Sequence, residues 1–260
     1  MSARGGQNER YVMTRVSIYA LVVTLVLQAV ALTTFAEEPI PITSVPLDLY
    51  QLKSWGTKHY FLSQYRKKFR SLPSGLAVIE RELHPVGKLP LETHVDADRV
   101  TMRQYWRDPE AKLSRMWIEY QCAFDNILTM EKITTRYQDK IATADTTEGK
   151  YDIEVFGHRR IGKWPENTMT DAAMLRIVTL LPRIEGTAFT VPNWSRTPQL
   201  GVESTNGDPI RCVGKQTLKV RGKEFTCTKF ECKRMHAWVT DDDVLVRAES
   251  PGWWILELDE

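Results

Sequence analysis

The sequence predicts an α+β fold, in which a large curved, mostly antiparallel β-sheet forms a half-barrel or meander and about two helices cover its concave face. Short segments of alternating apolar and polar residues follow one another with tight turns between them, most clearly in the C-terminal third. Two other segments carry apolar residues at helical spacing. Sequential strands with short turns pair as neighbours, and helices on one face of an antiparallel sheet define the α+β class.

An apolar run over residues 16–36 follows Arg4, Arg10 and Arg15 and ends in Thr34-Phe35-Ala36. This order is typical of a secretory signal peptide and predicts cleavage after residue 36. An uncleaved inner-membrane anchor is the alternative, since about 20 apolar residues span a bilayer. Either way we expect an exported protein of the periplasm or cell envelope, with only transient membrane association unless this segment is retained.

Composition limits the function of the remaining chain, in which residues 37–46 form an extended, Pro-rich lead-in and residues 47–260 a single half-barrel-like domain. The whole chain has 35 Lys and Arg against 33 Asp and Glu. The first 36 residues hold three Arg and one Glu, so the remainder carries equal numbers of both charges. Nucleic-acid binding needs a basic excess, and we therefore expect no nucleic-acid partner.

The first helix is expected over residues 47–70, with Gly56 allowing a start near Thr57. Its apolar stripe consists of Leu52, Trp55, Leu62, Tyr65 and Phe69. Its other face carries the basic residues Arg66, Lys67, Lys68 and Arg70. This basic cluster suits contact with anionic lipid. The more common interpretation is the solvated side of an amphipathic helix.

Strands are expected in the middle of the chain. One runs over residues 113–124, with Met116, Ile118, Tyr120 and Cys122 on one face. Asp125-Asn126 predicts a turn into a strand over residues 127–137, and Thr147-Glu148-Gly149 predicts a hairpin before residues 151–155.

A second helix is expected after the loop at residues 164–167. Thr170 or Asp171 caps it, and Pro182 ends it. Its buried stripe consists of Ala173, Met174, Ile177, Val178 and Leu181.

The C-terminal third predicts an antiparallel meander. Its strands are expected over residues 210–220, 224–233, 236–240, 244–249 and 253–258. Trp253 and Trp254 are adjacent on the last strand and therefore face opposite sides, which indicates a second contact surface or helices on both faces.

Three motifs carry a family resemblance that covers residues 170 to the C-terminus. Residues 170–176 and 180–186 resemble the helix and LP-x-x-x-G step of an exported bacterial family of unknown function. Residues 214–227 resemble its G-x-E-x-V-x-V-P-x-G-x-F-x-C hairpin, with Gln216 in place of the acidic residue and Arg221 in place of Pro. Residues 237–242 are similar to its W-x-S/T-x-D strand. That family is similar in shape to the periplasmic lipoprotein-carrier half-barrels. The resemblance implies a curved sheet around an apolar interior, which takes up acyl chains in related carriers, and it implies no catalytic residue.

The sequence contains no recognisable catalytic or cofactor-binding motif. The five histidines are scattered, and G-x-S-x-G, Walker and dinucleotide-binding loops are missing from the sequence. We therefore expect a non-enzymatic protein without a cofactor. Cys227, Cys232 and His236 lack the usual zinc spacing, and Asp241-Asp242-Asp243 lacks the spacing of a calcium loop, so no metal site is expected.

The four cysteines all lie in the exported part, where an even number favours disulfides. A three-residue loop at residues 221–223 pairs Val220 with Glu224 and sets Cys212 opposite Cys232, which predicts a Cys212–Cys232 bridge. A two-residue loop would set Cys212 against Glu231 instead. Cys122 and Cys227 are then either bridged or buried as free thiols.

Three functional hypotheses remain. The leading one is a lipid- or acyl-chain-binding protein with an apolar pocket under the sheet. Its pocket candidates are Trp55, Leu62, Tyr65, Phe69, Met174, Ile177, Val178 and Trp238. The second is an envelope scaffold or interaction module with a filled core. The third is a hydrolase, which requires the carboxylates of Glu80, Glu82, Asp96 or Asp98 to meet in a cleft.

Overall fold

The computed structural model describes the chain from residue 38 onward with gaps, namely residues 38–74, 77–96, 99–105, 116–125, 127–137, 140–146, 148–155, 158–166, 168–191, 193–195 and 208–259. The predicted signal peptide or anchor lies outside these residues. Apart from Glu38, they belong to one compact unit, Pro39–Glu260. Within this described part, none of the helices is long and apolar enough to cross a lipid bilayer.

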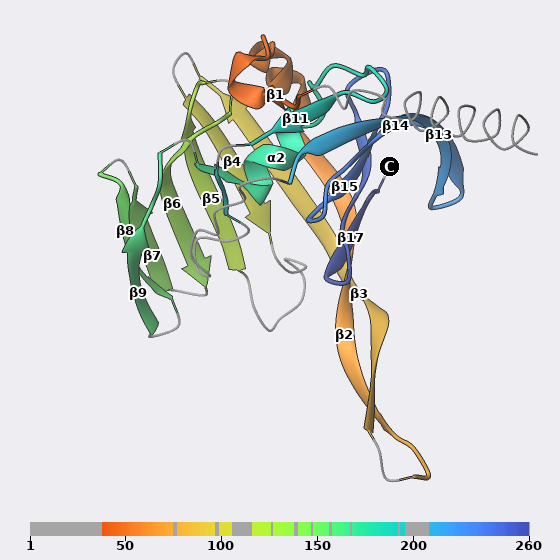
Figure 1. Cartoon of the computed structure of the whole chain (residues 1–260). Helices are drawn as coiled ribbons and strands as arrows, with labels where there is room; N and C mark the ends of the chain where they lie inside the picture. The colour runs from red at the N-terminus through yellow and green to blue at the C-terminus, as the bar shows by residue number, and fades with distance from the viewer. Residues whose placement is uncertain are drawn as a thin grey trace, which may run out of the picture. The chain divides into compact units, whose positions relative to one another are not determined.

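A large sheet dominates the unit and confirms the expected α+β class (Figure 1). Its strands, in spatial order, are β1 (Ile40–Pro41), β11 (Ala188–Thr190), β13 (Ile210–Val220), β14 (Lys223–Glu231), β15 (His236–Val239), β16 (Leu245–Ser250), β17 (Trp254–Leu258), β2 (Thr57–Ser71), β3 (Ala77–Val95), β4 (Arg99–Tyr105), β5 (Met116–Ala123), β6 (Met130–Tyr137) and β7 (Lys140–Asp145). β1 pairs with β11 in parallel, and the other described neighbours are antiparallel. The C-terminal strand β17 pairs with β2 and so joins the two halves of the sheet.

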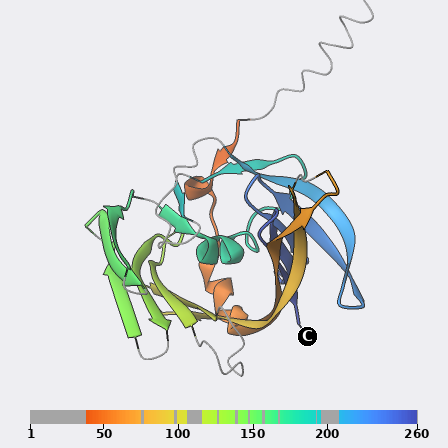
Figure 2. The ribbon, with the colours of Figure 1, turned by 90° about the horizontal axis from the view of Figure 1, so that it is seen from below.

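The sheet curves around its helical elements. Figure 2 shows α2 (Asp171–Ile177) in the space that the strands enclose, with the 3₁₀ helix η2 (Leu49–Trp55) beside it. A second 3₁₀ helix, η1 (Ile42–Ser44), follows β1. Two small sheets complete the unit, one of β8 (Lys150–Val155) and β9 (His158–Lys163), the other of β10 (Thr168–Thr170) and β12 (Asn193–Ser195).

The second predicted helix is confirmed as α2, although it ends at Ile177 rather than at Pro182. The side-chain oxygen of Thr170 accepts a hydrogen bond from the backbone N–H of Ala173 at 3.2 Å, which satisfies one of the free donors at the helix start. All eight residues from 172 to 179 are buried, so the helix lies with its whole circumference inside the unit.

The predicted helix over residues 47–70 is wrong beyond Trp55. Gly56 adopts a φ of 48°, which ends η2, and residues 57–71 continue as the strand β2. The backbone hydrogen bonds of β2 run to β17 on one side and to β3 on the other. These long-range pairings satisfy the backbone as well as a helix would, so they override the three- and four-residue spacing of the apolar residues.

The C-terminal meander matches the prediction in all five strands, but the predicted loop length at its first turn is wrong. Val220 pairs with Lys223, so the turn has two residues, and a bulge between Cys212 and Gly214 shifts the register again. Cys212 therefore lies opposite Phe230 rather than Cys232, and the predicted bridge is not formed. All four cysteines are buried free thiols.

Two clusters of buried apolar residues divide the core. The larger one, here called the concave cluster, joins α2 and η2 to the inner face of the sheet and also includes Ile42 and Val45 of the lead-in. The smaller one, here called the outer cluster, consists of Val220, Cys227, Trp238 and Val246. Trp238 alternates with Ala237 and Val239, which belong to the concave cluster, so the outer cluster lies on the opposite face of the sheet.

Candidate functional site

One charged side chain of α2, that of Arg176, lies fully buried beside the concave cluster. Arg176 is 0% exposed and is the largest fully buried side chain of the described residues. It lies within a run of buried residues that extends from Ala172 to Thr179 and is otherwise uncharged. A guanidinium is rarely buried without a carboxylate partner, because removal from water disfavours the charge.

Arg176 connects α2 with η2 and with the strand β3. Its Nε donates to the hydroxyl of Thr93 at 3.1 Å, and its Nη2 donates to the backbone oxygen of Glu92 at 3.3 Å, both on β3. Its Nη1 donates to the backbone oxygen of Ala172 within α2 at 3.0 Å. Its guanidinium carbon lies 5.3 Å from the ring centroid of Trp55 in η2, a cation–π distance.

The partners of this charge are neutral. Among the described residues, no carboxylate lies within ion-pair distance of the Arg176 guanidinium; the carboxylate of Glu92 instead lies 3.6 Å from Arg103, and that of Asp171 accepts from the indole of Trp194 at 2.6 Å. Burial lowers the pKa of Arg176 to about 10, so the group stays protonated at neutral pH. Burial also raises the pKa values of Tyr120 and Cys122, which therefore stay neutral beside it.

The structure brings together five of the predicted pocket residues. Trp55, Leu62, Met174, Ile177 and Val178 all belong to the concave cluster. The packing around α2 is close, since Met174, Ile177 and Val178 are 0% exposed.

The other three predicted pocket residues lie elsewhere. Tyr65 is half-buried. Leu62 belongs to the concave cluster, and Gln64 shares its face of β2, so the next residue, Tyr65, faces away from the concave side. Trp238 is in the outer cluster, between Lys229 and Arg247, whose cationic groups lie 5.6 and 5.4 Å from its ring centroid. The side chain of Phe69 lies outside the described part of the structure.

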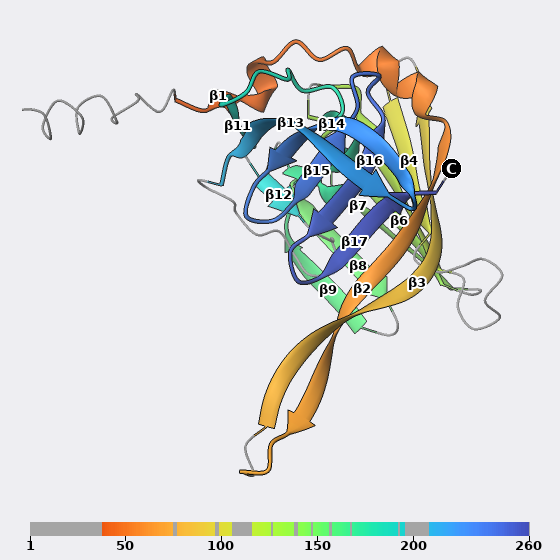
Figure 3. The ribbon, with the colours of Figure 1, turned by 90° about the vertical axis from the view of Figure 1, so that its right-hand side faces the viewer.

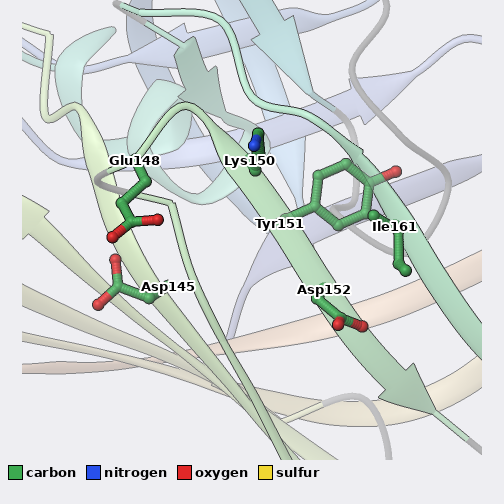
Figure 4. Close-up of a pocket in the computed structure, with 6 residues that line it drawn as sticks. All are labelled: Asp145, Glu148, Lys150, Tyr151, Asp152 and Ile161. Atoms are coloured by element: carbon green, nitrogen blue, oxygen red, sulfur yellow. The ribbon is translucent and has the colours of Figure 1, made fainter.

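A hollow of different character lies at the far edge of the sheet (Figure 4). This pocket has a volume of about 480 Å³. It is lined by Asp145, Glu148, Lys150, Tyr151, Asp152 and Ile161. In Figure 4 the carboxylates of Asp145 and Glu148 point toward one another.

The position of the Tyr151 ring in this hollow requires a glycine at residue 162. Gly162 lies opposite Tyr151 across the β8–β9 pair, and a Cβ at this position would come within 2.5 to 2.7 Å of the tyrosine ring. The ring then packs edge-on against Trp164 at a centroid distance of 6.1 Å. Asp152 pairs with Arg159, whose hydrogen bond lowers the pKa of that carboxyl. Four of the six lining residues are charged, and Tyr151 belongs to the concave cluster as well.

The carboxylates of the hydrolase hypothesis do not meet. Glu80 and Glu82 are exposed and pair with Arg70 and Lys68. Asp96 follows the opposite end of β3, about 45 Å from Glu82 along the strand. Asp98 lies outside the described residues. This arrangement does not support the hypothesis.

The polar residues considered as metal ligands are dispersed as well. His236 lies 3.0 Å from a carboxylate oxygen of Glu249, and Cys227 and Cys232 belong to different clusters. The carboxylate of Asp241 pairs with Lys215 at 2.7 Å, and that of Asp243 pairs with Arg183. Within the described ranges, no three His, Cys, Asp or Glu side chains form a group that could hold a metal ion.

The sequence motifs did not predict a functional role for Arg176, which lies in the helix motif of residues 170–176. A signal for its burial was nevertheless present, because it interrupts an otherwise uncharged run from Ala172 to Thr179 in a helix that is apolar all round. No protein-family model matches this chain, and neither a curated protein nor a solved structure matches it.

Proposed function

We propose that the chain is a non-enzymatic, exported protein that holds a lipid acyl chain with a negatively charged end between the concave face of the sheet and the cover formed by η2 and α2. The observation that carries the proposal is the buried guanidinium of Arg176 without a carboxylate partner among the described residues. An apolar residue of similar volume commonly stabilises a core as well or better than a buried charge does. Packing alone therefore does not account for a cation at this position, whereas an anionic ligand would neutralise it.

The short length of η2 and α2, which form the cover, also supports uptake of a ligand. η2 and α2 are seven residues each, and isolated helices of this length are not stable in water. Their position depends on packing and on the hydrogen bonds from Arg176 to β3. An anion that accepts from Arg176 competes with the oxygens of Thr93 and Glu92, so its arrival weakens the link between α2 and the sheet. Displacement of the short helical cover then opens the concave cluster to the acyl chain.

Two measurements test this function. The first is native mass spectrometry of protein purified from the cell envelope, followed by identification of the released lipids. The second compares oleate with oleyl alcohol, which share one chain and differ in the end group. We expect the protein to bind oleate at least about tenfold more tightly, because a hydrogen bond to a charged group contributes about 1.5–3 kcal/mol.

Matched variants assign the preference to one residue. Arg176→Met should abolish the difference between oleate and oleyl alcohol, and Arg176→Lys should retain part of it. Arg183→Met is the control, because Arg183 donates to the backbone oxygen of Thr179 just after α2 but pairs with the carboxylate of Asp243. Thermal unfolding of each variant separates loss of binding from loss of folding. Absence of co-purified lipid together with no oleate binding by the wild type contradicts the proposal.

A second function, an envelope scaffold or interaction module with a filled core, is favoured by the close packing of the cover. All residues from 172 to 179 are at most 3% exposed. A protein of this kind should bind neither oleate nor a hydrophobic dye, and it should retain a protein partner in pull-downs from envelope extracts.

A further inference from the structure

The strands β2 and β3 extend beyond their neighbours as a two-stranded arm, here defined as residues 65–71 and 77–83. β17 pairs with β2 only as far as Gln64, and β4 pairs with β3 only from Leu91 onward. Figures 1 and 3 both show the hairpin projecting away from the rest of the sheet. Its seven residues per strand reach about 20 Å beyond the last pairing with β17. Two strands without a third are marginally stable in water, so this arm gains from a surface that covers it.

The pairing register gives the arm two different faces. One face, here called the ion-paired face, carries Arg66, Lys68, Arg70, Val78, Glu80 and Glu82. On it, Lys68 lies 3.2 Å from Glu82, and Arg70 lies 3.4 Å from Glu80. The other face, here called the apolar–basic face, carries Tyr65, Lys67, Ile79, Arg81 and Leu83. This second face has two cations and no carboxylate among its described side chains.

Two positive charges lie opposite each other on the apolar–basic face. Lys67 and Arg81 are direct cross-strand partners, and such a pair destabilises a hairpin in solution. Ile79 and Leu83 flank the pair and are 55% and 42% exposed, so the face combines exposed aliphatic side chains with the two cations. An anionic surface relieves the repulsion, and an apolar layer behind it accepts the aliphatic side chains.

An exposed tryptophan extends this face at the base of the arm. The backbone oxygen of Trp253 accepts from the N–H of Tyr65 at 2.9 Å, which places Trp253 in the row of Tyr65 and Leu83. Trp253 is 59% exposed, while its neighbour Trp254 packs against the concave cluster. Arg81 also donates to the backbone oxygen of Gly252 at 3.3 Å, so the turn and the arm are in contact.

We propose that the apolar–basic face, together with Trp253, docks on the surface of an anionic phospholipid bilayer. Lys and Arg keep their charges at the phosphate level while their stems lie along apolar surface, and Trp and Tyr favour the same interfacial depth. Aliphatic side chains reach below that level into the boundary of the acyl chains. An acidic protein would satisfy Lys67 and Arg81 but not the exposed Ile79, Leu83 and Trp253. This docking goes beyond the acyl-binding function and does not depend on it.

The test uses the full chain with an environment-sensitive fluorophore attached at Ser74→Cys, an exposed position between the two strands of the arm. The four native thiols are buried, so labelling is selective. Vesicles of phosphatidylcholine alone are compared with vesicles that also contain phosphatidylglycerol. Because the readout is local, insertion of the N-terminal apolar run does not mimic it. We expect a blue shift on the anionic vesicles alone.

Two double variants with the same loss of charge distinguish the faces. Lys67→Gln with Arg81→Gln should weaken partitioning roughly 25-fold, since each basic side chain at an anionic surface contributes about fivefold. Lys68→Gln with Arg70→Gln, on the ion-paired face, should weaken it less than about fivefold. Ile79→Ser with Leu83→Ser should remove the blue shift even where the protein still binds.

Three outcomes overturn the proposal. The first is an equal effect of both charge variants, which indicates diffuse attraction to the whole arm. The second is the absence of a difference between the two kinds of vesicle. The third is the same blue shift with polyglutamate, which assigns the face to an acidic protein. Oleate binding is measured separately, so failure of the docking and failure of the acyl-binding function are distinguishable.

Discussion

At the scale of single residues, burial controls the chemistry of the free thiols. Cys227 and Cys232 are 1% and 7% exposed, and burial raises the pKa of each to about 11. The pKa of a thiol in the unfolded chain is about 8.5. Between these values the unfolded state has already released protons that the folded state still binds. The resulting stability is complete below the unfolded pKa and is lost as the pH rises through the folded pKa.

We therefore expect the free energy of unfolding to fall between pH 9 and pH 11, by roughly 1 kcal/mol per pH unit for each of these thiols. Denaturant unfolding under reducing conditions at several pH values measures it. Lysines and tyrosines contribute to the same slope, so the decisive quantity is the difference between the wild type and Cys232→Ala. In Cys232→Ala the free energy of unfolding should fall less steeply with pH. A fall as steep as in the wild type would contradict the assignment of this pH dependence to Cys232.

At the scale of elements, the β13–β14 hairpin shows how backbone conformation sets register. Arg221 and Gly222 have φ angles of 48° and 90°, as in the two-residue type I′ turn that matches the twist of a hairpin. Only glycine adopts such angles without cost. Arg221 also pairs with Asp259 at 3.1 Å and lies 4.6 Å from the ring centroid of Phe61, so this turn is linked to the chain end and to β2.

Gly222→Ala should lower the free energy of unfolding by about 1–2 kcal/mol. A Cβ at this position meets nothing within 4 Å, so the cost comes from the positive φ alone. Gly222→Asn is the matched variant and should cost less, because asparagine visits the left-handed region more readily. Chemical denaturation measures both, and an alanine variant as stable as the wild type would argue against this turn.

At the scale of the whole molecule, the β17–β2 pair connects the halves of the sheet. Leu256 lies opposite Leu62, and both are buried in the concave cluster. About 190 residues separate them in the chain, and such non-local pairing is typical of slowly folding β proteins. Loss of packing at this junction should therefore affect both halves together.

Leu256→Ala should destabilise the protein by about 2–5 kcal/mol, through lost burial and the cavity that remains. Glu257→Ala, its neighbour on the partly exposed face, should cost less than about 1 kcal/mol. Near-ultraviolet circular dichroism and tryptophan fluorescence should give coincident unfolding transitions in both variants. Separate transitions in Leu256→Ala would show that the halves fold independently.

The sequence by itself determined the elements whose signals are local. The five C-terminal strands follow from period-two patterns and turn residues, and α2 follows from a capping threonine and an apolar run. The adjacency of Trp253 and Trp254 also predicted that they face opposite sides, and only Trp254 packs against the concave cluster while Trp253 is exposed. In each case the deciding interactions lie within a few residues of one another.

Only the tertiary structure decided what depends on distant partners. Residues 57–71 carry apolar spacing that suits a helix, yet they become a strand because β3 pairs with their whole length and β17 pairs with residues 60–64 on the other side. The bulge at Cys212 and Gly214 set the cysteine register. The packing of η2 and β3 around α2 placed the charge of Arg176 inside the core. The physical reason is that pairing and burial are set by segments far apart in the chain, which local periodicity does not record.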